Sequence, residues 1–222
     1  GVMGEKVLLP GNLMNYSLSV GTAVDLIAHN NQGIYVCNIG DTEIRQIMSY
    51  INSDLDANYI NSAVMIDEDH LVLAYTSMDD YEQEIVVTAK VDPEDIPDKR
   101  VLVLAGSYIA YNLRKRVFEF NKTSEKYRIT LRDYSTYNTN ADYNLGQTQL
   151  NSDIISGDIP DVLVVDSTVE MQNYISKGLF TDINTLIEND EELSQTEFME
   201  NVFNAYSVDG KFYQVIPSFT VN

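Results

Sequence analysis

Tyrosine, carboxyl and hydroxyl side chains stand directly after three short apolar runs in the second half of the chain. Tyrosine rings pack against the C–H face of a pyranose, while carboxylates and hydroxyls hydrogen-bond to its hydroxyl groups. If the runs are parallel strands, these side chains meet at one edge of the sheet, where open α/β folds place their ligands. The sequence therefore predicts a carbohydrate-binding edge built from Ser107, Tyr108, Tyr134, Asp166 and Ser167.

Each of these side chains also has a structural alternative. Ser167 fits the N-cap of a helix, and Tyr108 fits the apolar face of the helix that follows the first run. Asp133, beside Tyr134, is a residue type that forms turns through its own side chain. Both interpretations stay open at the level of the sequence.

Other chemistries find less support in the residue pattern. Asp54, Asp56 and Asn58 have the opening spacing of a calcium loop, but Tyr59 stands where the loop needs glycine and Met65 where it needs glutamate. A solvated turn is therefore expected there. The sequence has no Gly-x-Ser-x-Gly elbow, no phosphate-binding glycine loop and no zinc-ligand pair for its two histidines, so neither enzyme activity nor a cofactor or metal is predicted.

The apolar runs alternate with helix-like stretches, which predicts a parallel sheet. Strands are expected over 101–105, 127–132 and 162–165, with helices near 109–118 and 150–155, the second ending at Gly157. Two later segments, 167–170 and 194–197, fit the capping box and predict helix starts. Gly178 is expected to close the first of these helices, and Asp209-Gly210 to form a hairpin turn before a strand over 211–216.

The first half has a different pattern. Five strand-length apolar runs, separated by polar turns, predict an antiparallel meander; they are 23–28, 33–37, 62–66, 71–75 and 84–91. Segment 42–50 is compatible with a helix or a strand and stays ambiguous. The acidic segment 92–98, with two prolines, predicts an extended linker, so the expected domains are 1–98 and 99–222.

The net charge of the chain excludes several partners. It is −20, from 34 acidic and 14 basic residues, and a field of that sign repels nucleic acids and anionic membranes. The charge is uneven: residues 1–98 carry 17 acids and three bases, whereas 99–222 carry 17 and 11. The single cysteine, Cys37, stands in an apolar run and is expected to be a buried, inert thiol. If the protein is exported, its targeting segment has been removed.

Several phrases of residues 99–222, taken in order, resemble one family. They are Lys99-Arg-Val-Leu-Val-Leu-Ala-Gly106, Val117-Phe-Glu-Phe-Asn-Lys122, Tyr127-Arg-Ile-Thr-Leu-Arg-Asp-Tyr134, the segments 150–162 and 174–182, and Asp209-Gly-Lys-Phe-Tyr213 with Pro217. This part is similar to the extracellular solute-binding proteins of ABC importers, in particular those of the sugar type.

The resemblance implies a periplasmic-binding-protein type of α/β fold with two lobes that close on a solute, and an ABC permease that receives the solute. The match ends inside the first lobe, so the chain is expected to be truncated, with self-association through the surface that truncation exposes. Ser218, at the strand that crosses to the other lobe, joins the expected binding residues. Residues 1–98 look similar to part of a β-propeller, and the intact protein is expected to be an extracellular lipoprotein.

Two other function classes remain as alternatives. In the first, the acidic β-rich half makes the protein a cell-surface adhesion or protein-interaction module with no small-molecule ligand. In the second, the chain is a hydrolase with a propeller domain, which the absence of nucleophile motifs makes the weakest hypothesis.

Overall fold

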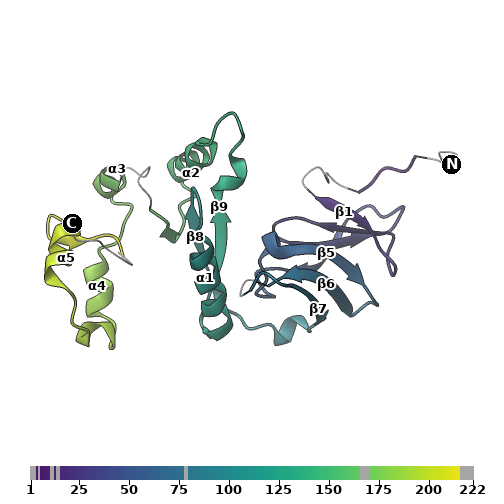
Figure 1. Ribbon diagram of the computed structural model, residues 1–222, viewed down its shortest axis with the longest axis horizontal. Coiled ribbons are helices and arrows are strands. Elements are labelled where there is room, and N and C mark those ends of the chain that lie inside the picture. The colour runs from purple at the N-terminus through teal and green to yellow at the C-terminus, as the bar shows by residue number, and fades with distance from the viewer. Residues whose placement is uncertain are drawn as a thin grey trace. The chain divides into compact units, whose positions relative to one another are not determined.

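The computed structural model describes residues 4, 6–10, 13, 16–77, 80–165 and 171–215 (Figure 1). The chain divides into two compact units, 1–164 and 165–222, and each is described by itself. The first unit contains antiparallel sheets followed by a parallel sheet with helices. The predicted combination of a β-rich meander and an α/β parallel sheet is thereby confirmed.

Two antiparallel meanders form the first part of this unit, which we call the β part (residues 17–89). The first sheet has the strand order β1-β2-β3-β4 and the second has the order β5-β6-β7. Their strands are β1 (Ser17–Val20), β2 (Leu26–His29), β3 (Gly33–Cys37), β4 (Arg45–Ser49), β5 (Ile60–Met65), β6 (His70–Thr76) and β7 (Gln83–Ala89). The short helix η1 (Ala57–Tyr59) connects the two sheets.

One apolar core joins the two meanders. Ile27 and Ile34 of the first sheet and Leu73 of the second are completely buried in a common cluster. The Thr22 hydroxyl donates a hydrogen bond of 2.6 Å to the Met65 carbonyl and ties the start of one sheet to the other. Core residues recur at every second position, as Ile34 and Val36 do in β3 and Leu71 and Leu73 in β6, because side chains two positions apart lie on the same face of a strand.

The ambiguous segment 42–50 contains a strand, β4, because its residues pair with β3 in antiparallel register from Gly33–Ser49 to Val36–Arg45. Strand β1 was not predicted: its residues Ser17-Leu18-Ser19-Val20 alternate polar and apolar over only four positions, and all four are exposed. Cys37 is buried in β3 as expected, and burial raises the pKa of its thiol.

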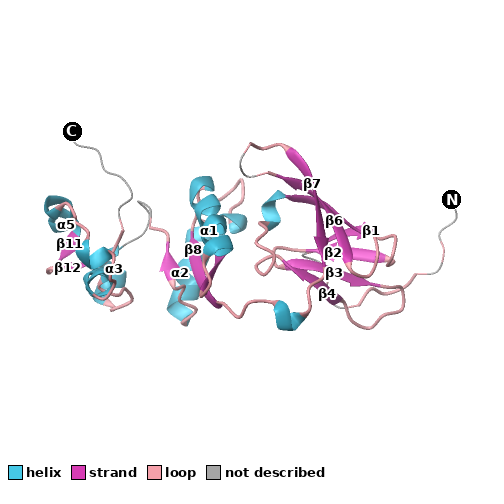
Figure 2. Ribbon diagram, turned by 90° about the horizontal axis from the view of Figure 1, so that it is seen from below, coloured by secondary structure: helices cyan, strands magenta, loops and turns pink. Residues whose placement is uncertain are grey.

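A three-stranded parallel sheet forms the α/β part (residues 100–163). Its order is β10-β8-β9, with β8 (Arg100–Gly106) in the centre, β9 (Tyr127–Asp133) on one side and β10 (Val162–Leu163) on the other. Helices α1 (Tyr111–Thr123) and α2 (Leu145–Ser156) connect the strands and lie on opposite faces of the sheet (Figure 2), as right-handed crossovers to opposite sides of β8 require. The predicted parallel arrangement is confirmed, and Gly157 ends α2 as expected.

Helix α1 is attached to the sheet by apolar packing and by one amide. Val117 is buried against Leu104 and Ile109. The Asn121 side chain donates to the Ile129 carbonyl at 2.8 Å and accepts from the Ile129 N–H at 2.7 Å. Asn121 therefore satisfies backbone groups on the outer edge of β9, which no strand covers among the described residues.

The second unit consists of short helices and one hairpin. Its elements are α3 (Met171–Ser176), α4 (Ile183–Glu188), η4 (Leu193–Gln195), α5 (Glu200–Tyr206), β11 (Ser207–Val208) and β12 (Lys211–Phe212). Asp209 and Gly210 form the predicted turn, both with positive φ (52° and 76°), and Gly178 ends α3. Phe203 stacks on Phe212 at 4.3 Å and holds α5 against the hairpin.

The capping box predicted at 194–197 is wrong. The Ser194 hydroxyl donates back to the Glu191 carbonyl at 3.4 Å, within the turn of η4, and α5 begins only at Glu200. The other predicted box, 167–170, lies outside the described residues. The strand predicted over 211–216 is too long: β12 ends at Phe212, residues 213–215 are not in a strand, and residue 216 lies outside the described residues.

Candidate functional site

The centre of the candidate site is the loop that follows β8. Gly106 ends this strand, and a Cβ atom there would lie 2.8 Å from the Val164 Cβ and 3.2 Å from the Tyr108 carbonyl oxygen. Only glycine allows the residue after β10 to approach β8 this closely. The loop 107–110 therefore leaves the sheet directly beside the end of β10.

Asp133, at the end of β9, fastens this loop to the next one. Its Oδ1 accepts from the Ser135 N–H at 2.9 Å, and its Oδ2 accepts from the Ile109 N–H at 3.3 Å. The first contact caps the short helix η3 (Tyr134–Tyr137). The turn-forming interpretation of Asp133 is thus the one that the structure supports. We call the two loops that it joins, 106–110 and 133–137, the binding edge.

Arg114 links the binding edge to the β part. Its guanidinium donates to Asp56 Oδ2 at 3.0 Å, to Asp133 Oδ2, and through Nε to the Ile109 carbonyl at 3.2 Å. Burial opposes the charge of Arg114, but the two carboxylates outweigh burial and its pKa is raised. A second buried arginine, Arg128 of β9, pairs with Asp54 at 3.1 Å.

The acidic loop around Asp54 and Asp56 therefore has a role that neither sequence interpretation foresaw. Asp56 caps η1 by accepting from the Asn58 N–H at 3.0 Å, and its other oxygen holds Arg114. The loop is not a solvated turn, because it forms the junction with the α/β part. Within the described residues no three His, Cys, Asp or Glu side chains are arranged to hold a metal ion.

Tyr134 fills the interior of the binding edge. Its side chain is 2% exposed, its ring stacks on Tyr137 at 5.8 Å, and its hydroxyl donates to Asp153 Oδ2 at 2.6 Å. Burial, together with the hydrogen bond to Asp153, raises its pKa. The Tyr134 ring is therefore packed inside the edge, and neither of its faces is open to a solute.

Two exposed rings complete the edge. Tyr108, predicted from the sequence, is 63% exposed, and Tyr137, which the sequence analysis did not select, is 54% exposed. Tyr137 could have been selected from the sequence, because it stands three residues after Tyr134 in a short helix that follows a strand. Ser107 is half-buried beside Tyr108. Tyr108 and Tyr137 are exposed and Ser107 and Ser135 are partly exposed, so these side chains of the edge are open to a solute.

The remaining predicted site residues cannot be placed. Asp166, Ser167 and Ser218 lie outside the described residues. The structure brings Ser107, Tyr108 and Tyr134 to the ends of neighbouring strands, as the parallel sheet requires.

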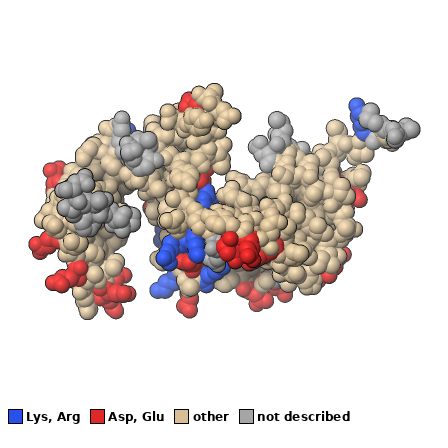
Figure 3. All heavy atoms as spheres, in the orientation of Figure 1, with Lys and Arg blue, Asp and Glu red and all other residues tan. Residues whose placement is uncertain are grey.

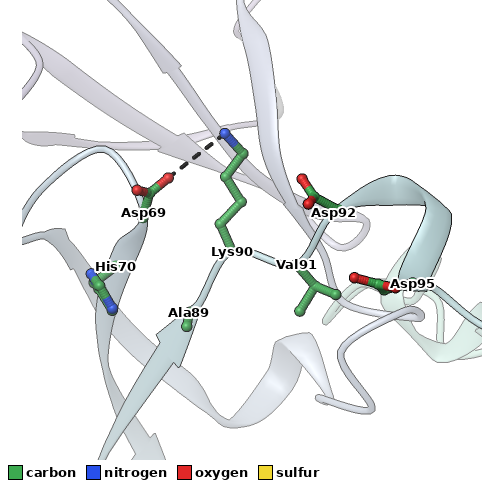
Figure 4. Close-up of a pocket in the computed structure, with 7 residues that line it drawn as sticks. All are labelled: Asp69, His70, Ala89, Lys90, Val91, Asp92 and Asp95. Carbon is green, nitrogen blue, oxygen red and sulfur yellow. Dashed lines mark ion pairs between the residues drawn. The ribbon is translucent and has the colours of Figure 1, made fainter.

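Two surface hollows occur elsewhere in the β part. One, of about 470 Å³, is lined by Asp69, His70, Ala89, Lys90, Val91, Asp92 and Asp95 (Figure 4). Lys90 of this hollow points toward Asp69 at 3.7 Å, and both side chains are well exposed. His70, the other basic side chain of the lining, pairs with Asp67 at 2.8 Å. The other, of about 390 Å³, lies between β4 and the strands β6 and β7.

Charge is distributed unevenly over the surface. On the face drawn in Figure 3, basic side chains gather over α1, and acidic side chains lie along the adjoining surface of the β part. This arrangement agrees with the charge difference between the halves of the sequence and with the pairing of Arg114 and Arg128 to acids of the β part.

No family model, curated protein or solved structure matches the chain. The described residues contain no helix of the length and apolarity that a membrane crossing needs.

Proposed function

We propose that this chain is part of an extracellular protein that captures a carbohydrate and delivers it to an ABC permease. The observation that carries the proposal is Tyr108, a ring 63% exposed in the loop after the central parallel strand. An exposed ring at that edge exposes a large apolar surface to water, which a sugar can cover with its C–H face.

The neighbouring groups fit the same ligand. Ser107 and Ser135, on the two loops of the edge, supply hydroxyls that both donate and accept hydrogen bonds, as sugar hydroxyls require. Asp133 and Arg114 bond to each other, and Asp133 also accepts from the Ile109 N–H. The edge therefore presents neutral polar groups to a ligand rather than a fixed charge. A neutral sugar is therefore favoured over a charged solute.

We also propose that the α/β part begins a periplasmic-binding-protein lobe and that the two meanders are blades of a β-propeller. The strand order β10-β8-β9 is compatible with the start of a periplasmic-binding-protein lobe, and two meanders packed through one core are compatible with neighbouring propeller blades. In the intact protein the lobe would close on the solute with a second lobe, and a lipid anchor would hold the protein at the cell surface.

A thermal-shift screen of this chain against neutral monosaccharides, oligosaccharides, amino acids and short peptides tests the proposal. A ligand that binds only the folded state raises the melting temperature. We expect a shift with one saccharide class and none with amino acids or peptides. A screen in which no saccharide shifts the transition would refute carbohydrate capture by this chain.

One observation favours the alternative, an adhesion or protein-interaction module. Apolar residues on the outer face of the second meander are exposed, among them Ile85 (77%) and Val87 (61%) of the edge strand β7. Exposed apolar faces of this kind are common in protein interfaces. Binding of a purified protein partner that is lost on Ile85→Lys, without any saccharide response, would support this alternative.

A further inference from the structure

Five tyrosines from the β part and the α/β part gather beside the binding edge. They are Tyr59 of η1, Tyr75 of β6, Tyr81 in the β6–β7 turn, Tyr108 in the loop after β8 and Tyr111 at the start of α1. Tyr59 is central: its ring centroid lies 6.4 Å from that of Tyr75 and 6.3 Å from that of Tyr111. Tyr81 joins the cluster by stacking on Tyr111, and Tyr108 stands three residues before Tyr111 in the chain.

The cluster is buried in its middle and open at its two ends. Tyr59, Tyr75 and Tyr111 are partly buried, whereas Tyr81 is 60% exposed and Tyr108 is 63% exposed. The two terminal rings therefore offer apolar surface on which a ligand can stack.

Tyr81 is held in place at a conformational cost. Its φ is +62°, a left-handed conformation that bulky side chains rarely adopt. Its N–H donates to the Ser77 carbonyl at 3.1 Å, and its ring stacks on Tyr111 at 5.2 Å with an interplanar angle of 29°. Strained residues of this kind occur most often at ligand sites. The turn thus presents one face of the Tyr81 ring to Tyr111 and the other to solvent.

We propose that Tyr81 is a second carbohydrate-stacking platform, so that the ligand is a neutral oligosaccharide contacting Tyr108 and Tyr81 together. This inference rests on the proposed function of the binding edge. Asp80 and Glu82, exposed on either side of Tyr81, can accept hydrogen bonds from sugar hydroxyls and would repel an acidic sugar. The β part then lengthens the site rather than acting only as a scaffold.

Calorimetric titration with a ladder of neutral saccharides of one linkage, from one to five residues, tests this inference. In the wild-type chain we expect the longest members to bind about tenfold more tightly than the monosaccharide. Tyr81→Asn should abolish this gain and leave monosaccharide affinity unchanged. Asparagine tolerates positive φ, so this variant removes the ring while relieving the backbone strain, and loss of folding does not explain the loss of affinity.

Two controls complete the experiment. Tyr81→Phe keeps the ring and should keep the gain, and Tyr143→Ala removes a ring that is 70% exposed on another loop and should change nothing. Equal affinity for all lengths in the wild type, or an unchanged gain in Tyr81→Asn, would overturn the second platform while leaving capture at Tyr108 intact. Absence of binding by every saccharide would overturn both.

Discussion

Arg114 carries its charge at a position only 9% exposed, and three acceptors surround it. A buried cation of this kind is tolerated because each N–H group that faces the interior finds an oxygen. The sequence could not reveal the pairing, since Asp56 and Arg114 are 58 positions apart and periodicity reports only local neighbours. The same limit concealed the pairing of Arg128 with Asp54.

Removal of one acid from this group should be costly. Asp56→Ala leaves the guanidinium buried with Asp133 as its remaining carboxylate, and we expect the free energy of unfolding to fall by about 3 kcal/mol. Urea denaturation of the purified chain measures the change. Asp67→Ala serves as the control, because this acid pairs with His70 at the solvent-exposed surface and its loss should have a much smaller effect on stability. Equal effects of the two substitutions would contradict the role given to Asp56.

Tyr75 predicts how stability responds to alkali. Burial raises the pKa of Tyr75 from its ordinary value of 10.0 to about 12. The unfolded chain ionises first as the pH rises, so this contribution to stability is complete below pH 10 and is lost as the pH approaches 12. Tyr75→Phe should therefore lose less stability than the wild type between these values in pH-dependent thermal unfolding. Tyr143→Phe, at an exposed position, should follow the wild-type profile.

At the scale of elements, strands were predicted where longer runs of apolar residues stand, and the short, fully exposed strand β1 was missed. Strands β3, β6 and β8 fall within a residue or two of their predicted bounds, because their buried faces produce the pattern. Helix α4 was missed, since at six residues it is too short for a periodic face. The wrong capping box shows that local hydroxyl and carboxyl spacing does not start a helix when the backbone between them is extended, as it is at Thr196.

Gly106 tests how the elements form the binding edge. In Gly106→Ala the new methyl group would meet Val164, and relief of that contact must displace the loop or the end of β10. We expect a loss of about 1–3 kcal/mol in stability and a weaker saccharide response in thermal shift. Gly4→Ala adds a methyl group where no atom lies within 4 Å and should leave both quantities unchanged. An unaltered saccharide affinity in Gly106→Ala would show that the loop does not hold the ligand.

At the scale of the whole first unit, the arginine pairs connect a β part and an α/β part that differ in composition. The sequence suggested two domains separated near residue 98, and the structure shows contacts across that boundary through Arg114, Arg128 and the tyrosine cluster. These contacts should make the two parts unfold together.

Calorimetry of a double variant tests this cooperativity. Arg114→Gln with Arg128→Gln removes the ion pairs to Asp56 and Asp54 that join the two parts, together with the Arg114–Asp133 pair inside the α/β part. We expect one additional transition relative to the wild type because the parts then melt separately. Arg116→Gln changes an exposed arginine on the same helix that pairs with Glu119, and should leave the number of transitions unchanged. A double variant that melts like the wild type would mean that the ion pairs do not couple the two parts.

The most direct test of carbohydrate capture is a calorimetric titration of the saccharide selected by the screen into three proteins. They are the wild type, Tyr108→Ala at the binding edge, and Tyr127→Ala at the opposite end of the same sheet, where the ring is 39% exposed. We predict about a tenfold loss of affinity in Tyr108→Ala and no change in Tyr127→Ala. Equal affinity in all three proteins would contradict the assignment of the site to this edge.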